Sequence, residues 1–124
     1  MPDDSAPHAR RRVLVVEDEV LLALSLEDHL RDHGWFVVGP YHDLTTARSA
    51  AAAEAFDCAI LDVNLNGEMV FPLAEDLLDR AVPFLFVTGY AAFNLPEHLR
   101  AVPRVAKPYE GLVLIEALGA IVSG

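Results

Sequence analysis

The chain has 124 residues, with 19 acidic and nine basic side chains and a formal net charge of −10 at pH 7. This length suits one domain, and the acidic balance disfavours nucleic acid as a partner, because non-specific binding to nucleic acid needs a basic surface. No apolar run approaches the ~20 residues of a membrane-spanning helix. No hydrophobic segment of a signal peptide follows the arginines at 10–12. We therefore expect a cytoplasmic protein without a membrane segment.

Strand-like and helix-like segments alternate along the chain. Residues 1–11 are expected to form a disordered tail, and residues 12–124 the folded domain. Apolar, β-branched runs predict five strands, at 12–16, 35–38, 58–63, 84–88 and 102–106. Helical periodicity and capping signals predict helices at 20–33, 46–55 (capped by Asp43 or Thr45), 70–80 and 110–122, and a short or irregular one at 96–100. Gly39-Pro40 is expected to end the second strand, and residues 64–67 to form a loop.

The predicted strands are apolar throughout instead of alternating between apolar and polar residues. Such strands belong in a sheet that is covered on both faces, and strand–helix alternation makes that sheet parallel. Right-handed crossovers then favour a doubly wound α/β fold, which places its site outside the carboxyl ends of the strands. The residues at the strand ends are therefore the candidates for function.

Polar residues follow four of the strands. The first strand ends in Glu17, Asp18 and Glu19, and the third contains Asp62. Carboxylates from two neighbouring strands would repel one another unless a hard cation with oxygen ligands lies between them. Mg²⁺ suits this pattern, with Mn²⁺ as the alternative, whereas the five histidines all lie away from the strand ends and make zinc improbable.

Asp62 taken alone fits two interpretations. It lies inside an apolar strand and needs a partner, which Lys107 after the fifth strand could supply as a buried salt bridge. A positioned carboxylate can instead attack phosphorus and form an aspartyl phosphate. That chemistry needs a metal, a cation and a hydroxyl donor around the phosphoryl group, and Lys107 and Thr88 provide the last two.

Four motifs in this order resemble those of the receiver domains of bacterial two-component response regulators, over residues 12–122. The motifs are Val15-Val16-Glu17-Asp18-Glu19, Leu61-Asp62-Val63-Asn64-Leu65 with Gly67, Phe86-Val87-Thr88-Gly89 and Lys107-Pro108-Tyr109. The fourth-strand motif is similar to that of a largely alphaproteobacterial subgroup with a Phe-Ala-Thr-Gly signature, several members of which are linked to general stress signalling. Val87 stands here where that signature has alanine.

The resemblance implies a flavodoxin-like fold with sheet order 2-1-3-4-5. It also implies Mg²⁺-dependent transfer of phosphate to Asp62 from a sensor histidine kinase or a histidine phosphotransfer protein. The implied metal ligands and phosphate-binding groups are Glu17, Asp18, Asp62 and the backbone carbonyl of Asn64 for the metal, and Thr88 and Lys107 for the phosphate. The Lys107-Pro108 bond is expected to be cis.

The sequence departs from the usual receiver pattern at the fifth strand. Arg104 stands where receivers carry a switch aromatic three residues before the lysine, and the stretch from Thr88 to Lys107 is shorter than usual. Tyr90 is hypothesised to take over part of the switching role, with a loop aromatic as the alternative. By resemblance, Asn64 and Tyr90 tune the loss of phosphate to water, and Gly89 leaves room for the phosphoryl group.

The expected function is therefore that of a stand-alone response regulator, since 124 residues leave no room for an output domain. It would bind a downstream protein partner or relay phosphate, as a monomer or weak dimer, with no catalysis beyond its own phosphorylation and dephosphorylation. One alternative is a degenerate receiver that acts as a protein-binding scaffold. Another is a phosphohydrolase, which would need an acid or base near Asp62 where Asn64 stands.

Overall fold

A five-stranded parallel sheet forms the centre of the molecule in this computed structural model, which describes residues 11–89 and 95–123. The sheet strands are β1 (Arg12–Val16), β2 (Phe36–Tyr41), β3 (Cys58–Asp62), β6 (Phe84–Thr88) and β7 (Arg104–Ala106), in the spatial order β2-β1-β3-β6-β7. Every neighbouring pair in this sheet is parallel. The order confirms the predicted doubly wound, flavodoxin-like fold. In this fold the order in which strands are added to the sheet reverses between β1 and β3.

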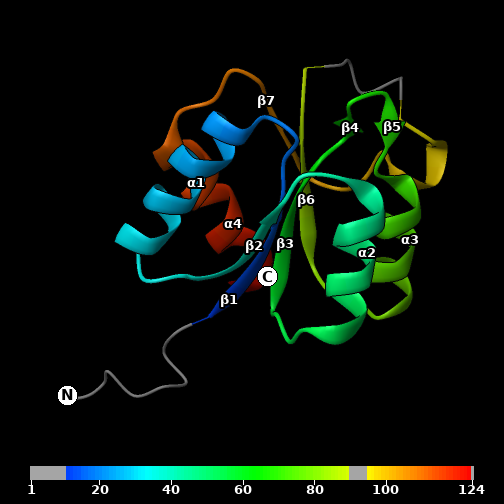
Figure 1. Ribbon diagram of the computed structural model, residues 1–124, viewed down its shortest axis with the longest axis horizontal. Helices are drawn as coiled ribbons and strands as arrows, with labels where there is room; N and C mark the ends of the chain where they lie inside the picture. The colour runs from blue at the N-terminus through cyan, green and yellow to red at the C-terminus, as the bar shows by residue number, and fades with distance from the viewer. Residues whose placement is uncertain (1–10, 90–94, 124) are drawn as a thin grey trace.

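Four α-helices cover the two faces of the sheet. They are α1 (Val20–Asp32), α2 (Leu44–Ala53), α3 (Phe71–Asp79) and α4 (Gly111–Ser123). Helices α1 and α4 lie on one face, and α2 and α3 lie on the other (Figure 1). None of the helices described is long and apolar enough to cross a membrane.

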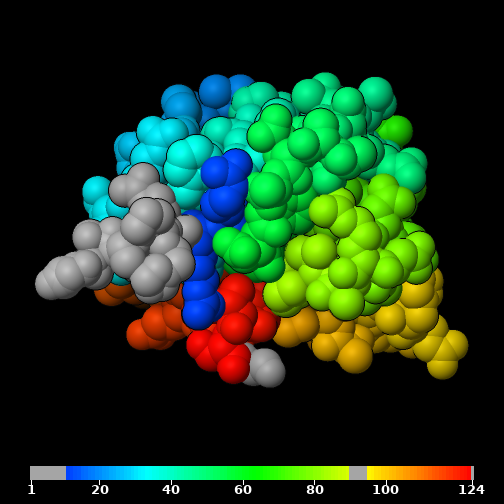
Figure 2. All heavy atoms as spheres, turned by 90° about the horizontal axis from the view of Figure 1, so that it is seen from below, coloured from blue at the N-terminus to red at the C-terminus, as the bar shows by residue number. Residues whose placement is uncertain are grey.

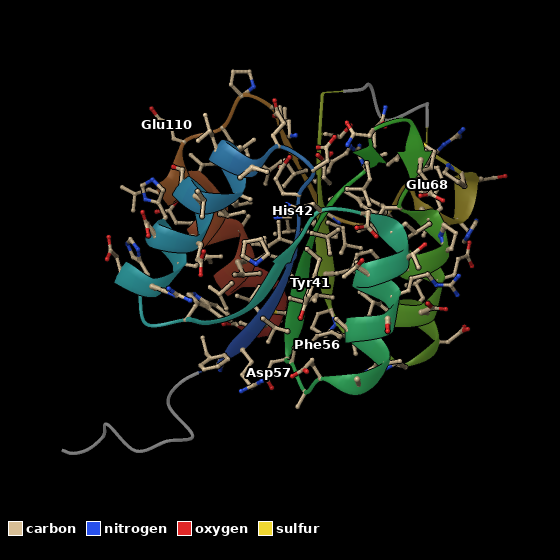
Figure 3. The ribbon with its side chains drawn as sticks, viewed as in Figure 1. Tyr41, His42, Phe56, Asp57, Glu68 and Glu110 are labelled. Carbon is tan, nitrogen blue, oxygen red and sulfur yellow. The ribbon has the colours of Figure 1, made fainter. Side chains whose placement is uncertain are left out.

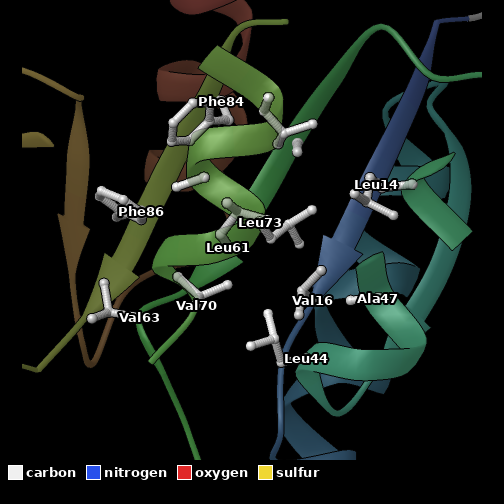
Figure 4. Packing of buried hydrophobic residues seen from close by; sticks show 14 of the residues in the cluster. Leu14, Val16, Leu44, Ala47, Leu61, Val63, Val70, Leu73, Phe84 and Phe86 are labelled. Carbon is white, nitrogen blue, oxygen red and sulfur yellow. The ribbon is translucent and has the colours of Figure 1, made fainter. Parts of the chain in front are cut away.

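Each sheet face carries its own apolar core. Successive residues of β1 alternate between the cores: Leu14 belongs to the α2/α3 side and Val15 to the α1/α4 side. Leu44 of α2 and Leu73 of α3 pack against the sheet on the first side (Figure 4). Because both faces are buried, neither face of a strand tolerates polar residues, which explains the apolar runs in the sequence.

The segment after β3 is a hairpin and not the loop that we expected. Strands β4 (Asn64–Leu65) and β5 (Glu68–Met69) pair antiparallel across Asn66 and Gly67, which have φ angles of 56° and 92°. Two successive residues with positive φ are typical of a type I′ turn, and Asn-Gly is its preferred sequence. The prediction was wrong because the turn signal was not combined with the short flanking strands.

Strand β2 continues through Gly39-Pro40 to Tyr41, although these residues were expected to end it. Leu14 pairs with Val38 and Val16 with Tyr41, so the register shifts by one residue between them. Gly39 absorbs this bulge at a φ of +107°, a conformation that suits glycine. A bulge thus keeps a proline inside an edge strand.

Other differences from the predicted elements are at their ends. Helix α2 begins at Leu44, two residues early, because the side chain of Asp43 caps it by accepting from the Thr46 N–H at 2.8 Å. The segment predicted at 96–100 contains only the 3₁₀-helix η3 (Glu97–Leu99), and β7 begins at Arg104. The predicted tail lies outside the described residues except for Arg11.

Substitution of Gly39 should be the more damaging of two glycine-to-alanine changes. A Cβ at Gly39 would lie 2.9 Å from the Val15 carbonyl oxygen, whereas one at Gly119 of α4 meets nothing within 4 Å. We expect Gly39→Ala to lower the free energy of unfolding by about 1–3 kcal/mol, and Gly119→Ala to raise it by up to about 1 kcal/mol. Urea denaturation measures both. Equal effects would contradict the description of the bulge.

Candidate functional site

The carboxyl ends of four parallel strands deliver polar side chains to one edge of the sheet. Glu17 follows β1, Asp62 and Thr88 end β3 and β6, and Lys107 follows β7. Strands β1 and β3 are neighbours at the point where the strand order reverses. A cavity of about 460 Å³ lies there, lined by Asp18, Glu19, Asp62, Asn64, Asn66, Gly67, Thr88, Gly89 and Lys107.

Three carboxylates meet at this edge. Glu17, Asp18 and Asp62 each offer an oxygen atom, and these atoms all lie within 4.8 Å of one another. Glu17 is only 2% exposed and Asp62 only 4%. Buried like charges at this separation oppose one another's ionisation, so the three carboxylates require positive charge nearby.

Lys107 supplies part of that charge. Its Nζ lies 2.9 Å from Oδ2 of Asp62 and 3.2 Å from Oε2 of Glu17, and 3.7 Å from Oε1 of Glu19. The Lys107 N–H donates to the Thr88 carbonyl at 2.9 Å, which continues the β6–β7 pairing past the end of β7. The Lys107-Pro108 bond that follows is cis. The ammonium group is therefore held against the carboxylates of Asp62 and Glu17.

The environment changes the pKa of the three carboxylates and of Lys107. Burial raises the pKa of Glu17 to about 8, and Asp62 contributes to the rise. The hydrogen bond from the Glu19 N–H and the charge of Lys107 oppose it. Burial also raises the pKa of Asp62, although Lys107 opposes the rise. Burial would raise the pKa of Asp18 too, but hydrogen bonds with Asp62, Glu17 and the Asn66 N–H outweigh it and lower that pKa. Burial alone would lower the pKa of Lys107, but Asp62 and Glu17 raise it.

The donor set fits a hard divalent cation. Three carboxylates and one ammonium leave an excess of negative charge, and oxygen ligands are those that Mg²⁺ and Mn²⁺ take. Burial is the main cause of the raised pKa of Glu17 and Asp62 adds to it, so a bound cation would favour the ionised carboxylate. Among residues 11–89 and 95–123, no second cluster of this kind occurs.

Backbone groups orient the carboxylates. The Glu19 N–H donates to Oε2 of Glu17 at 3.1 Å, and the Asn66 N–H donates to Oδ2 of Asp18 at 3.0 Å. The Asn64 N–H donates to Oδ1 of Asp62 at 3.3 Å. The hairpin β4–β5 thus presents two N–H groups to the site, one to each aspartate.

The structure brings together most of the site residues that were predicted from the sequence. Thr88 is 4% exposed and lines the cavity beside Gly89, where an added Cβ would meet nothing within 4 Å. Arg104 is exposed and does not line the cavity, and its Nη1 donates to the Arg100 carbonyl at 3.0 Å. Tyr90 lies outside the described residues. Ligation by the Asn64 carbonyl stays a prediction.

Sequence reasoning gave no role to three residues at or near the site. Asn66 contacts Asp18 through its backbone, which only the hairpin reveals. His42 directly follows β2, although the histidines were expected to lie away from the strand ends, and its Nδ1 contacts the Glu17 carbonyl. The expectation was wrong because β2 runs three residues further than predicted. The Tyr109 hydroxyl is buried with no hydrogen-bond partner among the described residues, and burial together with Glu17 raises its pKa to about 12. Its place after Lys107-Pro108 was the available signal.

Comparison with known proteins places this chain in a family. No family model matches the chain. SdrG from Sphingomonas melonis Fr1 is 36% identical, over 92% of this chain and 98% of that one, with a TM-score of 0.79. A structure of the BeF₃-activated conformation of SdrG, from Pseudomonas melonis Fr1, is also 36% identical, over 90% of this chain and 95% of that one, with a TM-score of 0.75.

Two further relatives carry regulator names. The receiver domain of the response regulator PhyR from Erythrobacter litoralis is 29% identical over 92% of this chain and 91% of that one, with a TM-score of 0.80. The transcriptional regulatory protein PdtaR from Mycobacterium tuberculosis is 30% identical over 117 residues, which are 91% of this chain and 57% of that protein. The chain thus spans little more than half the length of its curated relatives. It belongs to the response-regulator receiver domains of two-component systems.

Glu17 should make the metal-free protein less stable as the pH rises. Its pKa is raised in the folded state to about 8, so the fold favours the protonated carboxyl. This stabilisation is fully present below the ordinary pKa of 4.5 and is lost as the pH rises towards 8. In EDTA, Glu17→Gln should therefore flatten the fall in unfolding free energy between these pH values, measured by urea denaturation.

The exposed Glu116 of α4 provides a matched control. Glu116→Gln makes the same chemical change away from the site and should leave the slope of stability against pH as it is in wild type. A Glu17→Gln protein with the wild-type slope would contradict the assignment of this pH dependence to Glu17.

Proposed function

We propose that this chain accepts a phosphoryl group on Asp62 from a histidine kinase or phosphotransfer protein, and that its phosphorylated form signals to a partner. The observation that carries the proposal is the position of the Asp62 carboxylate. One of its oxygens lies 2.9 Å from the Lys107 ammonium, the other accepts from the Asn64 N–H, and two further carboxylates lie beside it. Membership of the receiver family supports the same role.

The transfer step follows from these groups. A carboxylate oxygen of Asp62 forms a bond to phosphorus while the bond from phosphorus to the donor's imidazole nitrogen breaks, and the imidazole leaves with that electron pair. Lys107 then balances charge on the phosphoryl oxygens, and the Thr88 hydroxyl donates a hydrogen bond to one of them. Both groups line the cavity that Asp62 faces, and Gly89 leaves space there.

Glu17, Asp18, Asp62 and the backbone carbonyl of Asn64 would hold Mg²⁺, or Mn²⁺ in its place. A divalent ion supplies further positive charge for the incoming phosphoryl group. Asp18 is suited to remain ionised, because hydrogen bonds lower its pKa. Glu17 would deprotonate as the ion binds, since the positive charge of the ion would oppose the rise in pKa that burial causes.

The surface beside the cavity favours a protein as phosphodonor. Directly after the acidic loop, α1 exposes three apolar side chains: Val20 at 54%, Leu21 at 82% and Leu24 at 51%. Exposed apolar residues gathered on one element are typical of protein contacts. A small phosphodonor would not contact such a surface. We propose no catalysis beyond self-phosphorylation and self-dephosphorylation.

The signal is proposed to leave the site without an aromatic switch in the fifth strand, because Arg104 replaces it and lies exposed. Thr88 and Lys107 are joined through their backbones, so movement at one reaches the β7 edge. The degenerate-receiver alternative leaves the conjunction of Asp62, Lys107 and Thr88 unexplained. Asn64 disfavours the phosphohydrolase alternative, since it offers no acid or base.

The decisive test is a titration of beryllofluoride with Mg²⁺, followed by NMR of backbone amides. Wild type should shift at the amides of Asn64, Thr88 and Lys107, because beryllofluoride on a carboxylate imitates an aspartyl phosphate. Asp62→Ala should abolish these shifts. Asp79→Asn, which changes an exposed aspartate of α3, should titrate like wild type. Wild-type amide shifts in Asp62→Ala would contradict the proposal.

A further inference from the structure

The end of β2 and the residue after it contact the loop at residues 17–19 through the backbone N–H and the backbone carbonyl of Glu17. The Glu17 N–H donates to the Tyr41 carbonyl at 2.9 Å. The Glu17 carbonyl accepts from Nδ1 of His42 at 2.8 Å. A carbonyl oxygen can only accept, so Nδ1 of His42 must carry the hydrogen. Tyr41, the last residue of β2, and His42, which follows it, thus fix the backbone of one carboxylate residue of the site.

The bulge in β2 brings His42 to this place. Two steps along β1, from Leu14 to Val16, correspond to three steps along β2, from Val38 to Tyr41. If the register did not shift after Leu14 and Val38, Val16 would pair with Pro40, and His42 would lie one residue beyond Glu17. Tyr41 and His42 are labelled at the upper end of β2 in Figure 3. The register therefore places the imidazole beside the first residue after β1.

His42 has little other structural work among the described residues. Its side chain is exposed, so it adds little to either apolar core, and its recorded hydrogen bond goes to Glu17. The side chain of Glu17 is buried and touches Lys107, and its Oε2 also accepts the Glu19 N–H. A shift of the Glu17 backbone would consequently displace the carboxylate, the ammonium contact and the start of α1 together.

We propose that His42 is a positioning residue for the metal and phosphoryl site, and that its Nδ1–H···O=C bond to Glu17 holds the 17–19 loop in the arrangement that binds a divalent cation. The inference rests on the proposed function for the identity of the ion. Outer-shell partners of metal ligands orient the ligands, and their loss typically weakens metal affinity tenfold or more.

Three variants separate the hydrogen bond from the ring. His42→Phe keeps a ring of similar size but removes the donor. His42→Asn restores a donor, since its amide nitrogen occupies the position of Nδ1. His33→Phe is the matched control, because Nδ1 of His33 also contacts a carbonyl, that of His29, at 2.9 Å, at the end of α1 away from the site.

The first measurement is Mg²⁺ affinity by NMR titration. We expect His42→Phe to weaken it about tenfold, and His42→Asn and His33→Phe to stay within about threefold of wild type. The second is amide hydrogen exchange of the metal-free protein. His42→Phe should speed exchange at the Glu17 and Glu19 N–H groups at least about tenfold, and the other two variants should not.

Each outcome decides the matter. Wild-type affinity and wild-type exchange in His42→Phe would overturn the proposal. So would an equal loss in His42→Asn, because the effect would then belong to the imidazole and not to its donor. A wild type that binds no Mg²⁺ overturns the proposed metal site, and amide exchange in the metal-free protein then decides alone whether His42 holds the loop.

Discussion

The contact between the Lys107 ammonium and the carboxylates of Asp62 and Glu17 is the interaction on which the site depends. Two nearly buried carboxylates would be costly to ionise at this sheet edge, and Lys107 is the cation in contact with both. Burial nevertheless raises the pKa values of both acids, although Lys107 opposes the rise. Three carboxylates beside one ammonium group are suited to bind a cation.

The fold makes this arrangement possible at small structural cost. Parallel strands end at one edge, so residues far apart in the chain, such as Glu17 and Lys107, meet there without any special loop. The two apolar cores lie beneath the site on either face of the sheet, one covered by α1 and α4 and the other by α2 and α3, and Figure 4 shows the second of them. At the other end of the sheet, the turns of α4 (red) lie beside the chain leading into β6 (yellow-green) in Figure 2. Polar chemistry is thereby separated from the packing that stabilises the domain.

Neighbouring segments refine the positions that the strands set roughly. The β4–β5 hairpin supplies the N–H groups of Asn64 and Asn66 to the two aspartates. The bulge at Gly39 places Tyr41 and His42 beside Glu17. Neither device follows from the apolar pattern of the strands, because each depends on one or two residues with positive φ.

The fold class and four of the residues that meet at the site could be predicted from the sequence. Continuous apolar strands between amphipathic helices require a parallel sheet covered on both faces, and that sheet sends Glu17, Asp62, Thr88 and Lys107 to one edge. Which groups touch could not be predicted in this way and is known from the folded structure. Whether Lys107 reaches Glu17 as well as Asp62, and whether His42 meets the Glu17 carbonyl, depends on strand register and side-chain packing between residues distant in the chain. Such contacts leave no local pattern in the sequence.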